Sequence, residues 1–390
     1  MRIYADHAAT TPVRDEVLQA MLPFFTSVYG NPSSLHTEGQ EARIAVENAR
    51  RKLAKAVGAG KEEMIFTSGG TESNHLAIHS ALSTKKGNHL IISSVEHASV
   101  LKAARSLEKA GYRISYLPVN RFGVADPDQL KDLITEETVL VSCQMVNNEI
   151  GSRMPVEKMG MICQSCGIVF HVDAVQALGK IRIDLSDFPV DLMSFSAHKI
   201  GGPKGIGALY CRDKKMMRPF FPGGEQERGA RPGTEYVPGI VGFGEAATIA
   251  AQETVLSSQK VRSLQDQLVS GLIREIPNIH FNGPLYGAEN RNEIPPTEIP
   301  GYINVRFEGI EGETLVQFAD MEGLAISSGS ACQEGTDQPS HVLTALGLSL
   351  KEARESVRIT IGAEQSLSQI DEMIRIFRSI VPRLRDLRRI

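Results

Sequence analysis

One stretch decides how the fold and chemistry of this chain are interpreted: Val190–Gly205, with the sequence VDLMSFSAHKIGGPKG. Its apolar part ends at Phe195 and leads through Ser196-Ala197-His198 to Lys199 and a glycine-rich turn. Burial at the end of a strand disfavours a charged ammonium, so a lysine there is a stronger nucleophile and suits Schiff-base chemistry. Taken alone, the stretch fits an ordinary surface-loop lysine better. The rest of the chain reverses that balance.

Short apolar runs alternate with helical patterns on both sides of this stretch. The expected strands are Met64–Thr67, His89–Ser93, Arg113–Pro118, Val139–Gln144, Ile168–Val172, Leu192–Ser196 and Gly207–Cys211. The expected helices are Glu41–Val57, Glu72–Ser83, Ser99–Gly111 and Asp126–Thr135. This alternation predicts an α/β fold with a mainly parallel sheet covered on both faces by helices. Ligands bind such sheets at the loops beyond the strand ends.

The pattern changes after residue 250. Helical patterns cover Val261–Glu275 and Leu367–Leu387, and the runs Ile303–Phe307 and Ser356–Ile361 are typical of strands. The stretch Phe281–Pro300 is rich in Pro, Gly and Asn and reads as a loop. We expect a second, smaller α+β domain with an antiparallel sheet.

Composition narrows the class of protein. The 390 residues are 42% hydrophobic and 23% charged, with a net charge of -4, which is ordinary for a globular chain of this length. We expect no direct nucleic-acid binding, because no long basic run is present. No stretch approaches the roughly 20 apolar residues that span a bilayer. The first residues have no apolar segment of signal-peptide length, so we expect no membrane association and a cytoplasmic location.

Five cysteines are too few for a disulfide framework in a chain this long. Cys143 and Cys211 lie in apolar, strand-like runs and are expected in the core. Cys163 and Cys166 form a Cys-x-x-Cys pair, but no second pair accompanies it and its surroundings read as a helix, which favours a structural role over a redox or metal site. Cys332 differs, because its small, polar Ser/Gly surroundings favour an exposed, reactive thiol.

Three further signals surround the lysine. The segment Phe66–Ser73 reads as strand, glycine turn and helix start, which suits an anion, although a simple capped helix fits it equally well. Asp173 ends an apolar run and needs a cationic or hydrogen-donating partner, such as a protonated ring nitrogen or a structural ion pair. His97 can stack on an aromatic ring or move protons. Together with Lys199, these groups match what pyridoxal phosphate requires of a protein.

The chain resembles the cysteine desulfurases of the NifS/IscS group, class-V-aminotransferase-like pyridoxal-phosphate enzymes of fold type I. The resemblance runs nearly end to end. It rests on the motifs Asn31-Pro32-Ser33-Ser34, Gly69-Gly70-Thr71-Glu72-Ser73-Asn74, Glu96-His97, Val146-Asn147-Asn148-Glu149-Ile150-Gly151, Asp173-Ala174-Val175-Gln176, Ser196-Ala197-His198-Lys199, Arg231-Pro232-Gly233-Thr234 and Ser328-Gly329-Ser330-Ala331-Cys332. It implies a large cofactor-binding domain, residues 15–255, and a small domain, residues 1–14 and 256–390, that carries Cys332.

The resemblance implies a role for each residue around the cofactor ring. Lys199 forms the Schiff base and moves the proton at the substrate's Cα. Asp173 pairs with the ring nitrogen, and Gln176 hydrogen-bonds the ring hydroxyl. Asn148 lies beside the ring, in reach of the substrate as well. His97 stacks on the ring and handles protons at the substrate thiol.

The same resemblance assigns the phosphate site and the quaternary structure. Gly70, Thr71, Ser196 and His198 are expected to hold the cofactor's phosphate. A threonine of the neighbouring subunit completes this site in the family, and Thr234 matches it. The resemblance therefore implies a homodimer with shared active sites.

Substrate binding and sulfur transfer are assigned in the same way. Arg358 is expected to bind the carboxylate of L-cysteine, assisted by Asn31, because a guanidinium fork suits that group. Cys332 then takes the substrate's sulfur as a persulfide, and L-alanine leaves. The sulfur is passed to an acceptor protein such as an iron–sulfur scaffold or a thiolation enzyme. No metal is expected.

Two alternatives remain open on the sequence. One is a selenocysteine lyase or another pyridoxal-phosphate β-lyase, against which the retained Cys332 argues. The other is a non-catalytic assembly scaffold, in which Lys199 or Cys332 would be lost.

The chain also departs from the family at His7, Glu225 and Pro232, where asparagine, glycine, and serine or alanine are usual. None of these three departures removes a group that the chemistry needs.

Overall fold

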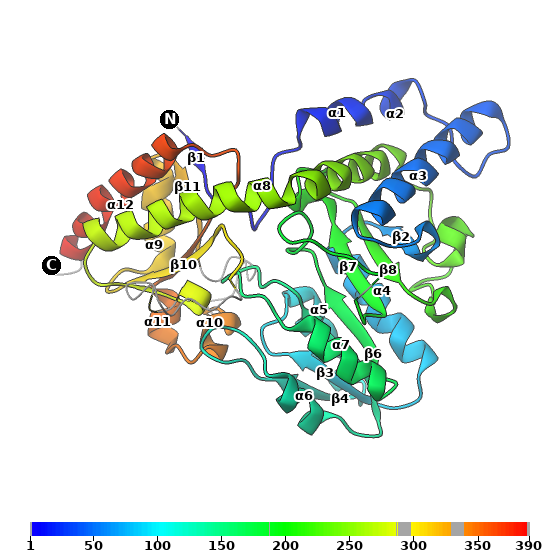
Figure 1. The fold of residues 1–390 in the computed structure, drawn as a ribbon, viewed down its shortest axis with the longest axis horizontal. Helices are drawn as coiled ribbons and strands as arrows, with labels where there is room; N and C mark the ends of the chain where they lie inside the picture. Colours follow the sequence, from blue (N-terminus) through cyan, green and yellow to red (C-terminus); the bar gives the residue numbers. More distant parts are fainter. Residues whose placement is uncertain (1, 187, 286, 288–297, 329–338, 388–390) are drawn as a thin grey trace.

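A seven-stranded sheet forms the larger part of the molecule (Figure 1). The computed structural model describes residues 2–186, 188–285, 287, 298–328 and 339–387. The strand order is β2 (Met64–Thr67), β8 (Gly207–Cys211), β7 (Leu192–Ser196), β6 (Val169–Asp173), β5 (Thr138–Gln144), β3 (His89–Ser93) and β4 (Arg113–Leu117). Only β8 runs antiparallel to its neighbours, β2 and β7, so the prediction of a mainly parallel sheet is confirmed.

Helices cover both faces of this sheet. They are α3 (Thr37–Ala56), α4 (Gly70–Thr84), α5 (Ala98–Lys109), α6 (Pro127–Leu133) and α7 (Val156–Ser165), preceded by α1 (Asp15–Met21) and α2 (Pro23–Thr26). Successive strand residues point to opposite faces, so Leu90 and Ile91 of β3 belong to two different apolar cores. Helices α4 and α5 contribute to one core, and α3 and α7 to the other.

A smaller, antiparallel sheet lies beside the large one, as the sequence predicts. Its strand order is β12 (Ser327–Ser328), β13 (Ser356–Thr360), β10 (Tyr302–Phe307) and β9 (Ile279–Phe281). A separate parallel pair joins β1 (Ile3–Tyr4) to β11 (Leu324–Ala325), which brings the N-terminus to this part of the fold. The accompanying helices are α9 (Gly312–Met321), α10 (His341–Ala345), α11 (Leu350–Arg354) and α12 (Leu367–Leu387).

One long helix, α8 (Val237–Glu275), crosses from the large sheet to the small one (Figure 1). The predicted helix over 261–275 is therefore too short. The first turns of the missed part contain Gly239, Gly242 and Gly244, which lower helix propensity but permit close packing. A Cβ at Gly244 would lie 2.7 Å from the Cα of Ala49 in α3, so the two helices approach too closely for a side chain there. The expected domain boundary at 255/256 falls inside α8.

The cysteines behave as expected where they are described. Cys143, Cys163 and Cys211 are buried, Cys166 is exposed, and all four are free thiols. Within the described ranges, no three His, Cys, Asp or Glu side chains come together as metal ligands. None of the described helices is long and apolar enough to cross a membrane.

Candidate active site

A cavity of about 600 Å³ lies between the strand ends of the large sheet and the small sheet. Residues from both sheets line it, together with the N-terminal segment at Asp6, Ala8 and Ala9. Ten residues assigned from the sequence meet here: Gly70, Thr71, His97, Asn148, Asp173, Gln176, Ser196, His198, Lys199 and Arg358.

The start of α4 forms one corner of the cavity. Strand β2 ends at Thr67, and Gly69 turns the chain with φ of 156°, a conformation that favours glycine. A Cβ on Gly70 would lie 2.7 Å from Cγ2 of Val175, so this position also needs glycine. The first-turn amides of the helix have no partners within it, and the hydroxyls of Thr71 and Ser196 line the same cavity. This corner can hold a phosphate.

His198 completes that corner as a neutral group. Burial, and after it the charge of Lys199, lowers the pKa of His198 to about 4. Its Nδ1 lies 3.1 Å from Oγ1 of Thr10, which fixes the ring. The imidazole can therefore offer a hydrogen bond to an anion without adding a charge at pH 7.

Asp173 ends β6 as a buried carboxylate. Its Oδ2 accepts a hydrogen bond from Nδ2 of Asn74 at 2.8 Å, and its Oδ1 accepts one from the amide of Val175 at 3.0 Å. Among the described residues, no Lys, Arg or His nitrogen lies within 4.0 Å of it. A buried carboxylate without an ionic partner is costly, so a cationic ring nitrogen would complete the site. Asn74, on the inner face of α4, was not assigned a role from the sequence.

His97 caps the N-terminus of α5 and lines the same cavity. The Ser99 amide donates to Nδ1 of His97 at 3.2 Å, so Nδ1 is an acceptor and the proton of the neutral ring is on Nε2. Burial lowers the pKa of His97, and the Asp173 carboxylate offsets only part of that shift. His97 is thus neutral at pH 7, with a donor nitrogen available for a ligand.

The N-terminal segment holds the lysine and the glutamine. Lys199 Nζ donates to the carbonyl oxygens of Ala8 at 2.6 Å and Ala9 at 2.7 Å. Nε2 of Gln176 donates to the same Ala8 oxygen at 2.8 Å. The sequence pattern did not reveal these contacts, because backbone carbonyls leave no residue-type signal.

Arg358 approaches from β13 of the small sheet. Its Nη2 lies 2.7 Å from Oδ1 of Asp6, and its Nη1 donates to the carbonyl oxygen of Asn148 at 3.1 Å. The guanidinium is 2% exposed, and its Nε is buried without a hydrogen-bond partner. An unsatisfied buried donor is costly, so the Nε/Nη2 edge is prepared for an anionic ligand such as a carboxylate.

Three assigned residues are not in this cavity. Asn31 and Thr234 are both exposed and do not line it, so one chain alone gives no support to the substrate role of Asn31. Thr234 was expected to act in the neighbouring subunit. Cys332 lies outside the described residues, although Ser327 and Ser328, which precede it, line the cavity.

Sequence and structure comparisons place the chain among known proteins. The model of the class-V aminotransferase family matches residues 3–373. The cysteine desulfurase IscS of Dictyoglomus turgidum is 43% identical over 388 residues, which cover 99% of this chain and 96% of that protein. A solved NifS-like protein has a TM-score of 0.90 at 36% identity, covering 98% of this chain and 100% of its own. SspA, solved in complex with cysteine, has a TM-score of 0.80 at 35% identity, covering 94% and 100%.

Proposed function

The chain belongs to the class-V aminotransferases and, within them, to the cysteine desulfurases, and we propose from this premise how its own residues carry the reaction. It is a pyridoxal-phosphate-dependent enzyme that removes sulfur from L-cysteine and releases L-alanine. The curated relatives that match nearly its whole length are cysteine desulfurases, which disfavours the lyase alternative.

The cavity fits pyridoxal phosphate at both ends of that molecule. Asp173 is buried without an ionic partner, as a site for a protonated pyridine nitrogen requires. The α4 corner, with Gly70, Thr71, Ser196 and His198, has the free amides and hydroxyls that a phosphate requires. We assign Gln176 to the ring hydroxyl, Asn148 to a position beside the ring and His97 to stacking on the ring. When bound, the cofactor supplies an electron sink that makes the Cα proton of the substrate acidic.

Two of the chain's own groups move or hold protons. Lys199 would take the proton from Cα of the substrate and return it. The Ala8 and Ala9 carbonyl oxygens limit where its amine can lie. His97 is neutral with its proton on Nε2, so it holds that proton toward the substrate sulfur and stabilises a thiolate there.

The single observation that carries the substrate assignment is the unsatisfied Nε of Arg358 in the cavity wall. A carboxylate that accepts from Nε and Nη2 would give that nitrogen its missing partner. Because Asp6 already engages Nη2, the guanidinium is oriented before substrate arrives. This arrangement fits a small amino acid, with its carboxylate fixed at Arg358.

Sulfur transfer is assigned to Cys332. The last described residue before it, Ser328, lines the cavity, and four residues of extended chain span at most about 14 Å. The Cys332 thiolate attacks the substrate sulfur, the carbon–sulfur bond breaks, and the sulfur stays on Cys332 as a persulfide while alanine is released. We further propose an iron–sulfur scaffold or a thiolation enzyme as acceptor and a cytoplasmic location.

The enzyme is proposed to be a homodimer, because Thr234 is outside the cavity of its own chain. Two ion pairs fix the segment that carries it. Arg50 pairs with the buried Glu227 at 2.6 Å, and Arg231 pairs with Glu72, next to Thr71, at 2.8 Å. A threonine presented on so firmly anchored a segment suits contact with a second copy. Any role of Asn31 would likewise require that copy.

Mixing two inactive variants tests the shared site. Lys199→Ala subunits combined with Thr234→Ala subunits should recover part of the alanine-forming activity. In the mixed dimer, one site carries both changes, whereas the other keeps its own Lys199 and receives Thr234 from the Lys199→Ala subunit. A fully active monomer at the concentration of the assay would contradict the proposal.

A further inference from the structure

Two side chains outside the cofactor cavity hold the amide of Gln176. Its Oε1 accepts a hydrogen bond from the Tyr302 hydroxyl at 2.6 Å and another from Lys180 Nζ at 2.9 Å. Lys180 Nζ also donates to the backbone oxygen of Gln176 at 3.2 Å and lies 5.4 Å from the centre of the Tyr302 ring. Tyr302 begins β10, so this contact joins the small sheet to the large one.

The partners of Gln176 fix which way its amide points. An ammonium can only donate a hydrogen bond, so the atom facing Lys180 must be the oxygen. The Ala8 carbonyl can only accept, so the atom facing it must be the nitrogen. The two lone pairs of Oε1 are occupied by Lys180 and Tyr302, whereas Nε2 keeps a second hydrogen. Gln176 can therefore act toward a ligand in the cavity only as a donor.

We propose that Lys180 is a positioning residue that transmits its positive charge through the Gln176 amide to the ring oxygen of the bound cofactor. This inference rests on the proposed contact between Gln176 and that oxygen. A cation at Oε1 polarises the amide and strengthens the Nε2–H donor, since hydrogen bonds in a chain reinforce one another. A stronger donor favours the anionic form of the oxygen that accepts from it. Tyr302 holds the same orientation without supplying a charge.

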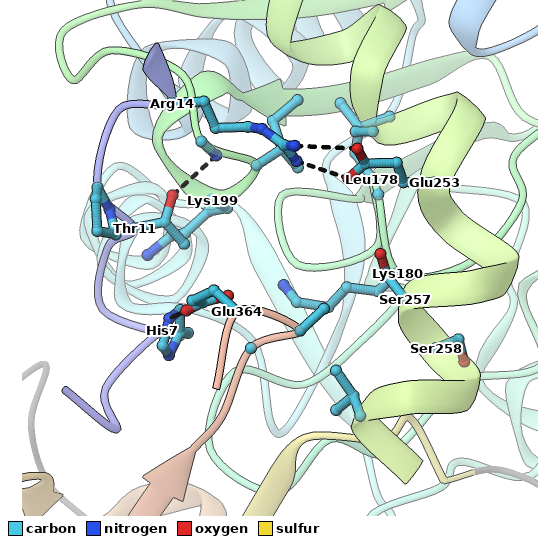
Figure 2. Close-up of a pocket in the computed structure, with 18 of the residues that line it drawn as sticks. His7, Thr11, Arg14, Leu178, Lys180, Lys199, Glu253, Ser257, Ser258 and Glu364 are labelled. Carbon is cyan, nitrogen blue, oxygen red and sulfur yellow. Dashed lines mark hydrogen bonds and ion pairs between the residues drawn. The ribbon is translucent and has the colours of Figure 1, made fainter. Parts of the chain in front are cut away.

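Lys180 has its own access to solvent, which makes its charge adjustable. Figure 2 shows its side chain in a second cavity, of about 660 Å³, which shares Lys199 with the first. Burial lowers the pKa of Lys180 to about 7, and the charge of Lys199 acts in the same direction. The other charged or titratable groups that line this cavity are His7, Arg14, Asp15, Glu16, Glu253 and Glu364. His7 pairs with Glu364, and Arg14 pairs with Glu253.

The test compares the visible absorbance of the bound cofactor across pH in four holoenzyme variants. Lys180→Met removes the charge and keeps the bulk, and Lys180→Arg keeps the charge. Tyr302→Phe removes a neutral donor, and Lys204→Met removes an exposed charge that makes no contact with Gln176. Cofactor affinity of the apoprotein is measured for each variant by fluorescence.

We expect Lys180→Met to raise the pH midpoint of the absorbance change by about one unit, because a nearby positive charge favours the deprotonated form of the bound cofactor. It should also weaken cofactor binding about tenfold, by the same coupling. Lys180→Arg should restore a midpoint at or below the wild-type value, and Lys204→Met should leave it unchanged. Tyr302→Phe should move it less than Lys180→Met does.

A wild-type midpoint and affinity in Lys180→Met would overturn the inference. So would equal effects of Lys180→Met and Lys180→Arg, since these would indicate loss of packing and not of charge. Gln176→Leu separates this failure from that of the proposed function. If Gln176→Leu shifts the midpoint and Lys180→Met does not, only the proposed effect of the Lys180 charge is wrong, and the contact between Gln176 and the cofactor stands. If Gln176→Leu also leaves the midpoint unchanged, Gln176 does not contact the ring oxygen, and the effect proposed for Lys180 is wrong as well.

Discussion

The loops after β6 and β7 and the segment Asp6–Thr11 meet in the same cavity but contribute in different ways. The loops supply side chains with chemistry, the Asp173 carboxylate and the Lys199 amine. The N-terminal segment contributes chiefly through its backbone, as the carbonyl oxygens of Ala8 and Ala9 receive Lys199 and Gln176. The reactive groups thus lie at the strand ends, and a separate turn segment aligns them. Side-chain variants at the strand ends should therefore lose more activity than side-chain variants in the N-terminal segment.

The largest effect is expected at the strand end. Lys199→Ala should lower alanine formation by more than about 10³-fold, because we assign the transfer of the Cα proton to Lys199. It should also remove cofactor that is held covalently after borohydride reduction, which mass spectrometry detects. The matched control is Lys204→Ala, five residues along the same loop, which should keep both. The reverse pattern, with covalent cofactor in Lys199→Ala and none in Lys204→Ala, would show that Lys204 and not Lys199 binds the cofactor.

A smaller effect is expected on the small-sheet side. Arg358→Ala should raise KM for L-cysteine by about 10- to 100-fold, the range for losing one or two charge-assisted hydrogen bonds. Cofactor affinity of the same variant should stay within about twofold, since Arg358 contacts Asp6 and Asn148 and none of the phosphate-corner residues. An unchanged KM would show that Arg358 does not bind the carboxylate of L-cysteine.

Glu149 tests how the loop after β5 depends on pH. Burial raises its pKa to about 7, and the hydroxyl of Ser340, the N-cap of α10, hydrogen-bonds its carboxylate. Because the folded-state pKa exceeds the unfolded value, its contribution is full below about pH 4.5 and is lost as pH rises through about 7. Between those limits, the wild type should lose up to about 3 kcal/mol of unfolding free energy relative to Glu149→Gln.

Urea unfolding of both proteins at a series of pH values measures that difference. Parallel stability curves from pH 4.5 to 8 would mean that the Glu149 carboxyl is ionised in the folded protein throughout.

The smallest effect is expected at His7. Its ring pairs with Glu364, whose side chain is 61% exposed, and such pairs contribute under about 1 kcal/mol. Because the segment works through its backbone, His7→Asn should cost no more than that and leave turnover within about twofold. Differential scanning calorimetry and an alanine assay measure the two quantities. A large loss of turnover would show that the side chains of this segment matter as much as its backbone.

The sequence predicted what depends on side-chain type and missed what depends on packing. Alternating apolar runs were enough for the main sheet. Polar residues at strand ends pointed to Asp173 and Lys199, which the structure brings to one cavity. The two-residue strands β1 and β11 are too short to show a period, and Gly239, Gly242 and Gly244 weaken the helical pattern at the start of α8. Asn74 looks like an ordinary helix residue until α4 turns its amide toward Asp173.

We propose that cofactor and substrate binding are separate from sulfur capture, which we assign to Cys332. The most direct test is mass spectrometry of the holoenzyme and of Cys332→Ala after incubation with L-cysteine in the absence of reductant. We expect one added sulfur on the wild-type peptide that contains Cys332. We expect Cys332→Ala still to bind cofactor and L-cysteine but to gain no sulfur and to release little alanine. Normal alanine release by Cys332→Ala, with sulfur appearing only as free sulfide, would contradict the assignment of sulfur capture to Cys332.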